Sequence, residues 1–304
     1  MRASKHIRWL STGGNTDCCS FAQKNQRTRR GNNQSLQEEN LLSIEAENLK
    51  LILYWSGLAL FLMLELISSY RQPSVSKLKR WLTNVPLSIT NGVLYHLFFS
   101  VALTTVFIQV ENRNLGLLNT FEAPIWLKYL LAVLLLDGVI YMWHLVNHEV
   151  PLFWRFHRVH HADMNMDVST ASRFHFGEIL LSGLVRLTVI YAFGIPLAAY
   201  LLFEILVNLS IEFHHSSIRI HKGFEQLWIT LFVPPSMHRI HHSVKIKERD
   251  SNYGVLFSFW DRLFGTFTRE TEQKKLIIGI GSHHDFSKLG FIHMLALPFT
   301  RKSR

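Results

Sequence analysis

The sequence predicts an all-α fold, a multi-pass membrane bundle of about four to five transmembrane or re-entrant helices with a cytoplasmic, histidine-rich helical cap. Three observations support this prediction. Long apolar runs occupy much of residues 51–211, and about 20 helical residues are enough to cross a bilayer core. Most of the 17 histidines of the 304-residue chain fall between positions 144 and 242. Within these clusters the histidines recur at helical spacing.

The apolar runs divide into five expected helices. The first is Leu51–Tyr70, the second is Pro86–Val110, and the third extends from about 124 to 143. The run from 179 to 211 is too long for one crossing, and Gly194-Ile195-Pro196 interrupts it. Because glycine and proline mark turns, we expect two helices here that are joined as a hairpin.

The loops between the apolar runs indicate the orientation of the bundle. The loop after the first run contains Arg71, Lys77, Lys79 and Arg80 and no acid, which is typical of the cytoplasmic side. The third helix then ends at the cytoplasm, and the hairpin returns the chain to that side, so the histidine clusters converge on one cytoplasmic face. The same count places the basic N-terminal tail outside. Either the first run is not a simple crossing or the tail does not determine the topology.

Charged residues inside the apolar runs are expected to serve the structure. Arg186 and Glu204 lie on the two arms of the hairpin, and charges within a membrane bundle are usually paired. We therefore expect an ion pair across the hairpin. Glu65 lies near the cytoplasmic end of the first run, where its side chain can extend to the surface.

Composition limits the domain organisation and the possible partners. Residues 1–48 are polar and are expected to form a tail, followed by a single membrane-embedded domain over residues 49–300. The net charge of +10 comes mainly from this tail, the first loop and the C-terminal end. Anionic lipid headgroups are therefore the expected partner, and no nucleic acid is expected. Cys18 and Cys19 are adjacent and form no metal-binding spacing.

Two histidine clusters share the spacing His-x-x-His-His, and a third has two histidines four residues apart. Both spacings place imidazoles on one face of a helix, where they can bind metal. One zinc ion needs only four protein ligands, so eight imidazoles predict a site with more than one metal ion. The eight residues are His144, His148, His157, His160, His161, His238, His241 and His242.

Further candidates lie beside these clusters. His214 and His215 end the last apolar run, where His215 shares a polar stripe with Glu212 and His214 points about 100° away. Both histidines are candidate ligands, and Glu212 is a candidate for binding or supporting the metal. His175 stands alone as a candidate ligand or a hydrogen-bonding residue. Asp137 lies deep in the third helix, where it can accept a hydrogen bond or pair with another polar group.

The motifs together resemble the membrane fatty acid hydroxylase/sterol desaturase superfamily. The resemblance covers roughly residues 45–300 and is most specific from 137 to 266. It rests on Asp137-x-x-x-Tyr141-x-x-His144-x-x-x-His148, the two His-x-x-His-His clusters, Phe213-His214-His215-Ser216, Asn252-Tyr253-Gly254 and Trp260-Asp261-Arg262-Leu263-Phe264-Gly265-Thr266.

This resemblance implies a dinuclear iron centre that activates O2 and attacks an unactivated C–H bond of a lipid. Members of the superfamily hydroxylate, desaturate or oxidatively cleave sterols, fatty acyl chains, sphingoid bases or alkylglycerols. It implies that Asn252 and Asp261 orient imidazole rings, and it leaves the role of His175 open. The implied iron ligands are His144, His148, His157, His160, His161, His215, His238, His241 and His242.

The residues alone do not select iron, because imidazole also suits zinc, copper and nickel. A membrane-surface zinc hydrolase of a lipid substrate, with Glu149 or Glu178 as its base, is the main alternative. A metal transporter or a haem-bearing membrane subunit is a second one. The chain has no flavin or nicotinamide fingerprint, so an oxygenase would need a separate electron donor: a ferredoxin, a cytochrome b5-like protein or a pterin.

Overall fold

The computed structural model describes residues 45, 48–269, 271–281 and 289–300. The chain divides after Leu51, and the description below concerns the second unit, Ile52–Arg304. The predicted polar tail, residues 1–48, lies almost entirely outside the described residues and stays a prediction.

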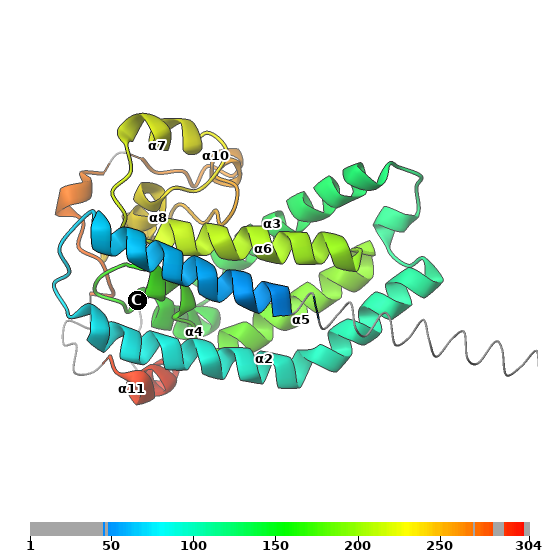
Figure 1. The fold of residues 1–304 in the computed structure, drawn as a ribbon, viewed down its shortest axis with the longest axis horizontal. Coiled ribbons are helices and arrows are strands. Elements are labelled where there is room, and N and C mark those ends of the chain that lie inside the picture. Colours follow the sequence, from blue (N-terminus) through cyan, green and yellow to red (C-terminus); the bar gives the residue numbers. More distant parts are fainter. Residues whose placement is uncertain (1–44, 46–47, 270, 282–288, 301–304) are drawn as a thin grey trace, which may run out of the picture. The chain divides into compact units, whose positions relative to one another are not determined.

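Five helices of the described chain are long and apolar enough to cross a membrane (Figure 1). The fold is therefore a multi-pass helical membrane bundle, as predicted, and the chain is an integral membrane protein. Apart from helices, the described residues contain only three isolated antiparallel β-bridges. The five are a first helix Asn48–Ile67, α2 (Lys77–Arg113), α3 (Ile125–Glu149), α5 (Phe176–Phe193) and α6 (Leu197–His215).

Shorter helices build the region around the histidines and the loops. The ones that position the site are α4 (Pro151–His161), η2 (Val168–Ser172), α7 (Lys222–Trp228), α8 (Pro235–His241) and α10 (Phe259–Leu263). The others are η1 (Leu117–Asn119), α9 (Ile246–Arg249), η3 (Gln273–Lys275), α11 (Phe291–Ala296) and η5 (Leu297–Phe299).

The hairpin of α5 and α6 follows the prediction. Gly194 ends α5 with a φ of 67°, a left-handed conformation that glycine adopts without steric cost. Pro196 then precedes α6. The predicted pairing is confirmed, because an Arg186 nitrogen lies 2.6 Å from Glu204 Oε1 across the hairpin. Apolar residues of α3 and α6 pack in one core, which holds the two helices that bear histidines together.

The second spanning helix is longer than predicted. It starts at Lys77 and continues through Pro86, so Lys77, Lys79 and Arg80 of the expected basic loop lie in its first turns, while Arg71 precedes it. The residues before Pro86 are held by contacts outside the helix, because Arg80 and Asn84 both donate hydrogen bonds to the buried Asp163.

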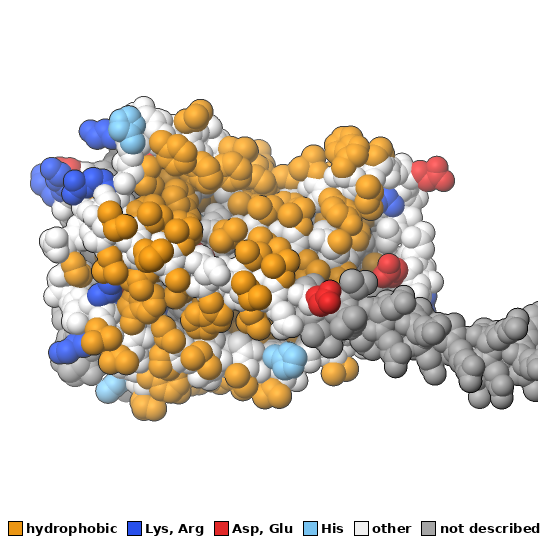
Figure 2. All heavy atoms as spheres, in the orientation of Figure 1, with side chains coloured by type: hydrophobic (Ala, Val, Ile, Leu, Met, Phe, Trp, Pro, Cys, Tyr) orange, Lys and Arg blue, Asp and Glu red, His pale blue; other side chains and the backbone are white. Residues whose placement is uncertain are grey.

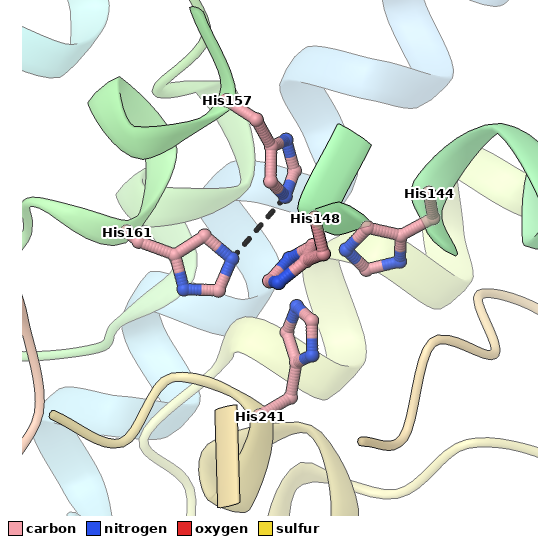
Figure 3. A group of neighbouring side chains, drawn as sticks. All are labelled: His144, His148, His157, His161 and His241. Atoms are coloured by element: carbon pink, nitrogen blue, oxygen red, sulfur yellow. Dashed lines mark hydrogen bonds between the residues drawn. The ribbon is translucent and has the colours of Figure 1, made fainter. Parts of the chain in front are cut away.

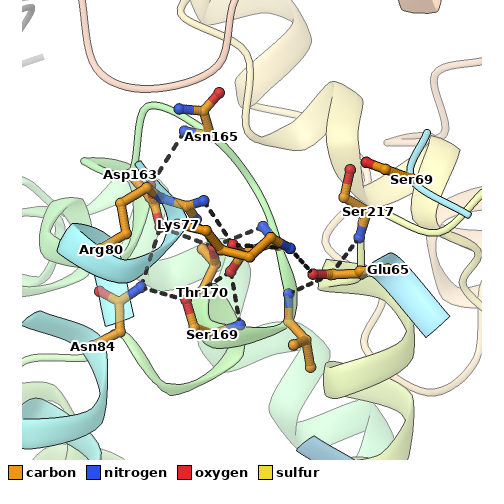
Figure 4. A network of polar contacts seen from close by, with 12 residues as sticks. Glu65, Ser69, Lys77, Arg80, Asn84, Asp163, Asn165, Ser169, Thr170 and Ser217 are labelled. Atoms are coloured by element: carbon orange, nitrogen blue, oxygen red, sulfur yellow. Dashed lines mark hydrogen bonds and ion pairs between the residues drawn. The ribbon is translucent and has the colours of Figure 1, made fainter. Parts of the chain in front are cut away.

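A buried polar network joins α2 to the segment that follows α4 (Figure 4). The Arg80 guanidinium donates to both carboxylate oxygens of Asp163, at 2.6 and 2.7 Å, and to Asp167 at 2.7 Å. Paired, charge-assisted hydrogen bonds of this kind are the strong ones in proteins. Because Asp163 follows His161 by two residues, the network fixes the end of α4 against α2.

Glu65 belongs to the same network, and the prediction that its side chain extends to the surface was wrong. It is 1% exposed. Its Oε1 accepts the backbone N–H groups of Val168 at 2.8 Å and Ser217 at 2.7 Å, and its other oxygen pairs with Lys77. Donors from three segments meet at this carboxylate, which compensates for its burial. Glu65 thereby ties the first helix to the loops that follow α4 and α6.

Replacing Arg80 by methionine is expected to destabilise the protein by about 3–5 kcal/mol, because two buried carboxylates lose their partner. Thermal unfolding in detergent measures the loss. The control is Lys275→Met, which removes an ion pair with Glu272 whose two side chains are largely exposed, so little change is expected there. An equal response of both variants would show that the Arg80 network does not stabilise the fold.

Candidate metal centre

Prolines and helix ends position the histidine-bearing segments. α3 ends at Glu149, and only Val150 separates it from α4, which starts at Pro151. In the sequence, Pro234-Pro235 indicates the start of a helix, because proline suits the first helical position, and α8 does begin at Pro235. These starts bring the two His-x-x-His-His clusters onto short helices that face each other across the end of α3.

Nine of the ten predicted histidine ligands fall into two buried groups. The potential ligand atoms within each group lie within 4.8 Å of one another. Figure 3 shows the five rings of the first group turned towards a common centre. This five-histidine group consists of His144, His148, His157, His161 and His241. The four-histidine group consists of His160, His215, His238 and His242.

The distances between ring nitrogens fit metal binding. Nε2 of His161 lies 3.2 Å from Nε2 of His157. In the second group, Nε2 of His215 lies 3.1 Å from that of His160 and 3.0 Å from that of His238. Ligands about 2.1 Å from an ion are about 3.0 Å apart at right angles and about 3.4 Å apart in a tetrahedron. The spacing is therefore compatible with one shared ion in each group.

In the five-histidine group, backbone and carboxylate oxygens determine which ring nitrogen faces inwards. Nδ1 of His144 lies 2.8 Å from the carbonyl oxygen of Tyr253, and Nδ1 of His241 lies 2.8 Å from that of Ser251. A carbonyl oxygen only accepts hydrogen bonds, so both Nδ1 atoms carry the proton. Nε2 of each ring is then a lone-pair donor, and it is buried without a hydrogen-bonding partner. This pattern is typical of metal-bound histidine.

Two carboxylates support the same group. Glu178 accepts a hydrogen bond from Nδ1 of His157 at 2.8 Å. Asp250 lies 3.3 Å from Nδ1 of His148. A carboxylate in this position makes the imidazole a stronger electron donor towards a metal. In the sequence Glu178 was only a possible hydrolase base, and nothing distinguished Asp250.

The four-histidine group has fewer such partners. Nδ1 of His215 donates to the carbonyl oxygen of Ile211, one turn back along α6, at 2.8 Å. Nδ1 of His160, His238 and His242 is buried without a hydrogen-bonding partner. Their Nε2 atoms face one another instead: Nε2 of His238 lies 3.0 Å from that of His215 and 3.2 Å from that of His242. A cation held between these atoms would have neutral imidazoles as its ligands.

Burial keeps the imidazoles neutral. It lowers the pKa of the site histidines outside the spanning helices well below the ordinary value. The charge of neighbouring imidazoles lowers these pKa values further. A neutral ring keeps the lone pair that a metal needs. The histidines concerned are His160, His161, His238, His241 and His242.

Comparison with known proteins agrees with this site. Residues 129–266 match the family model Fatty acid hydroxylase, a range that contains both histidine groups. Residues 129–266 thus belong to the fatty acid hydroxylase family, and this match and the relatives described next support the fatty acid hydroxylase/sterol desaturase superfamily that the motifs indicate. No solved structure matches it.

Several curated relatives are lipid hydroxylases or monooxygenases by name. Ornithine lipid hydroxylase OlsE of Rhizobium tropici is 31% identical over 60% of this chain and 53% of its own length. Human alkylglycerol monooxygenase is 31% identical over 64% of this chain and 42% of its own. Rat cholesterol 25-hydroxylase is 28% identical over 54% of this chain and 55% of its own. The chain thus spans about half the length of these relatives.

Two candidate ligands, His214 and His175, lie outside both histidine groups. The ring of His214 packs against that of His238, with centroids 4.1 Å apart, but it shares neither group. Its neighbour His215 occupies the inward face because successive helical residues differ by about 100°. His175 precedes α5, and its Nδ1 accepts the N–H of Gly177 at 3.0 Å. That histidine therefore caps a helix.

Asp137 and Asp261 act on the backbone near the site. Asp137 accepts the N–H groups of Leu256 at 3.1 Å and Phe257 at 3.2 Å, and the indole N–H of Trp260 at 2.8 Å. Asp261 accepts the N–H groups of Tyr253 and Gly254. No described contact joins either carboxylate to an imidazole. Asp261 holds the segment that contains Tyr253, whose carbonyl oxygen accepts the hydrogen bond of His144, so it acts on that ring through the backbone.

Asn252 supports the same segment. Its φ of 57° is left-handed, which asparagine tolerates better than most residues. Its side chain donates to the carbonyl oxygens of Met237 and Thr268. Glu212 lies elsewhere, against Gly57 of the first helix, and both carboxylate oxygens are buried without a hydrogen-bonding partner. It belongs to neither histidine group.

The lowered histidine pKa values predict that the metal-free protein loses stability in acid. Below about pH 6.5 the unfolded chain binds protons that the folded site does not. Each neutral histidine then lowers the unfolding free energy by about 1.4 kcal/mol per pH unit. Thermal unfolding of chelator-treated protein between about pH 7.5 and about pH 5.5 tests this. A midpoint that does not fall would contradict the burial of neutral rings.

Proposed function

We propose that this chain is a membrane-bound, O2-dependent di-iron oxidoreductase that hydroxylates or desaturates a C–H bond of a lipid of the sterol, fatty acyl or alkylglycerol type. One observation carries the proposal: a superfamily member has two adjacent, buried groups made of imidazoles alone. The two groups touch, because the ring of His161 in the five-histidine group stacks on the ring of His242 in the four-histidine group, with centroids 4.5 Å apart.

Each group would hold one ion. The five-histidine group leaves an ion fewer positions for other ligands than the four-histidine group does. When bound, the two irons would reduce dioxygen and supply the oxidant for the C–H bond. Imidazole ligands suit iron, and two adjacent groups of them provide for two ions.

The chain's own residues control the surroundings of the reaction. Glu178 and Asp250 hold the protons of His157 and His148 on the ring nitrogens that face away from the centre. All nine histidines of the two groups are at most 8% exposed, so water has little access to the reacting groups. Phe174 stacks on His160, with centroids 4.4 Å apart, and provides an apolar wall beside the four-histidine group.

The relatives' names and the bilayer suggest the partners. Ornithine lipid, alkylglycerol and cholesterol are all lipids that a membrane-embedded site receives from the bilayer. The electron donor would be a separate molecule, either a ferredoxin, a cytochrome b5-like protein or a pterin. We place the active site on the cytoplasmic face because basic residues precede and begin α2. Residues 49–300 would form the catalytic domain.

Metal analysis with Mössbauer spectroscopy tests the di-iron proposal. Protein purified from iron-replete cells is expected to contain about two irons per chain in a coupled pair, given two groups of imidazole ligands. His241→Ala removes a ligand of the five-histidine group, and His160→Ala removes one of the four-histidine group. Each variant is expected to lose iron and the coupled signal, because the remaining ion has no partner.

His221→Ala is the matched control. This histidine caps α7 through the N–H of Gly223 and belongs to neither group, so its variant should keep the iron content of the wild type. Zinc alone, at about one ion per chain, would overturn the oxygenase proposal and favour the hydrolase.

The reaction itself is tested with isotopically labelled dioxygen. Purified protein, a chemical reductant and an ornithine lipid, an alkylglycerol or a sterol are incubated, and products are analysed by mass spectrometry. Hydroxylation is expected to place one labelled oxygen atom in the lipid, and desaturation to remove two hydrogen atoms. Products that carry oxygen from labelled water instead would indicate hydrolysis and contradict the proposal.

A further inference from the structure

Five large apolar side chains are exposed on short helices outside the five spanning helices. They come from α7 and the residues after it and from the end of α10, and each is between 45% and 71% exposed. We name this surface the apolar collar. Its residues are Phe224, Leu227, Leu231, Leu263 and Phe264.

The two parts of the collar form one unit. The guanidinium of Arg262 and the hydroxyl of Ser258 both donate to the carbonyl oxygen of Ile229, at 2.6 Å each. The N–H of Ser258 donates to the carbonyl oxygen of Leu231 at 2.9 Å. Because these bonds join the end of α7 to α10, the exposed apolar residues of both helices lie on one continuous element.

The collar lies at the depth of the membrane. Trp260 of α10 donates to Asp137 at 2.8 Å and packs against Gly138. Asp137 is the middle residue of α3, about 18 Å along the helix axis from its end at Glu149. An element that packs against the middle of a spanning helix is alongside the bilayer core, which is about 30 Å thick.

The backbone of this element is satisfied within the protein, as the bilayer core requires. Non-helical backbone occurs at that depth only where protein groups take up its hydrogen bonds. Asp137 accepts the N–H groups of Leu256 and Phe257, and the carbonyl oxygen of Leu256 accepts the N–H of Val233. The intramembrane carboxylate of Asp137 thus accepts hydrogen bonds, as its sequence position allowed, and its partners include the backbone of this element.

A groove continues the collar onto the spanning helices. Its volume is about 440 Å³, and apolar residues of α3 line most of it, with Val185 of α5 and Trp260 and Phe264 from the collar side. Figure 2 shows hydrophobic side chains spread over α7, α6 and the first helix, while most lysine and arginine side chains gather at one end of this face. The collar is thus continuous with the lipid-facing surface.

We propose that α7, α10 and the segments around them form a re-entrant element inside the bilayer, with the acyl chains of lipids as the occupant of the collar and the groove. The element enters the leaflet from the side of the histidine groups and returns to it without crossing. This inference goes beyond the proposed function and depends on no oxidation chemistry.

Spin labels at single cysteines test the proposal. The chain has only two cysteines, Cys18 and Cys19, so a background with both changed to serine has no other thiol. Labels are attached at Leu227→Cys and Leu263→Cys, and the protein is reconstituted in phosphatidylcholine vesicles with a minority of phosphatidylglycerol. For each label, the increase in spin relaxation caused by oxygen is compared with the increase caused by a water-soluble nickel chelate. Oxygen concentrates in lipid, so the comparison tells whether the label lies in lipid or in water.

Two exposed apolar positions serve as controls. Leu97→Cys lies on the exposed side of α2, and Ile277→Cys lies on the cap at 63% exposure, close to the exposure of Leu263. The collar labels are expected to match the label at position 97, with strong relaxation by oxygen and weak relaxation by nickel. The label at 277 should show the reverse. Phe224→Cys provides a further collar site if one variant fails to retain the parent's thermal unfolding midpoint.

Two outcomes would overturn the inference. Collar labels that behave like the label at 277 would place the collar in water. Labels that neither reagent reaches, and whose spectra show broadening between spins, would mean that a second copy of the chain covers the collar. The readout does not involve catalysis, so a failure of the proposed oxidation would leave it unaffected.

Discussion

Nine neutral imidazoles face one another in an interior from which water is largely excluded, and this is the constraint on which the rest of the structure depends. Lone pairs that converge at about 3 Å repel each other unless a cation or a shared proton lies between them. The carbonyl oxygens of Ser251 and Tyr253 and the carboxylates of Glu178 and Asp250 fix ring orientations in the five-histidine group, so the inward nitrogens stay where a cation can use them.

Helices outside the matched range of the superfamily support this arrangement. The family match begins at residue 129, yet Glu65 and Arg80 lie well before it. Glu65 binds the backbone of Val168 and Ser217, which follow the histidines of α4 and α6, and Arg80 binds Asp163, which follows His161. Two parts of the chain therefore support the histidine groups. One is the segment around residues 251–257, and the other is the pair formed by the first two spanning helices. A histidine motif without these contacts would not specify the same positions for its rings.

Local patterns predicted much of the fold and most of the candidate site. The hairpin turn at Gly194 and the start of α8 at Pro235 depend on the backbone of a few residues, so the sequence was sufficient there. The position of Glu65 and the support of His148 by Asp250 could not be predicted in this way, because each contact joins residues about a hundred positions apart. A similar limit applies to His214: the 100° between successive helical residues separates it from His215, but which of the two faces the four-histidine group depends on how α6 packs against α8.

The repeated His-x-x-His-His motif does not correspond to one metal site per copy. The copy on α4 gives His157 and His161 to the five-histidine group and His160 to the four-histidine group. The copy on α8 gives His241 to the first group and His238 and His242 to the second. Both short helices thus contribute to both groups, and neighbouring residues on one rigid turn face different centres. If the groups hold the two proposed ions, an ion in either group would order α4 and α8, which also carry ligands of the other group. The first ion would then meet part of the ordering cost of the second, so the shared helices would favour occupation of both groups together.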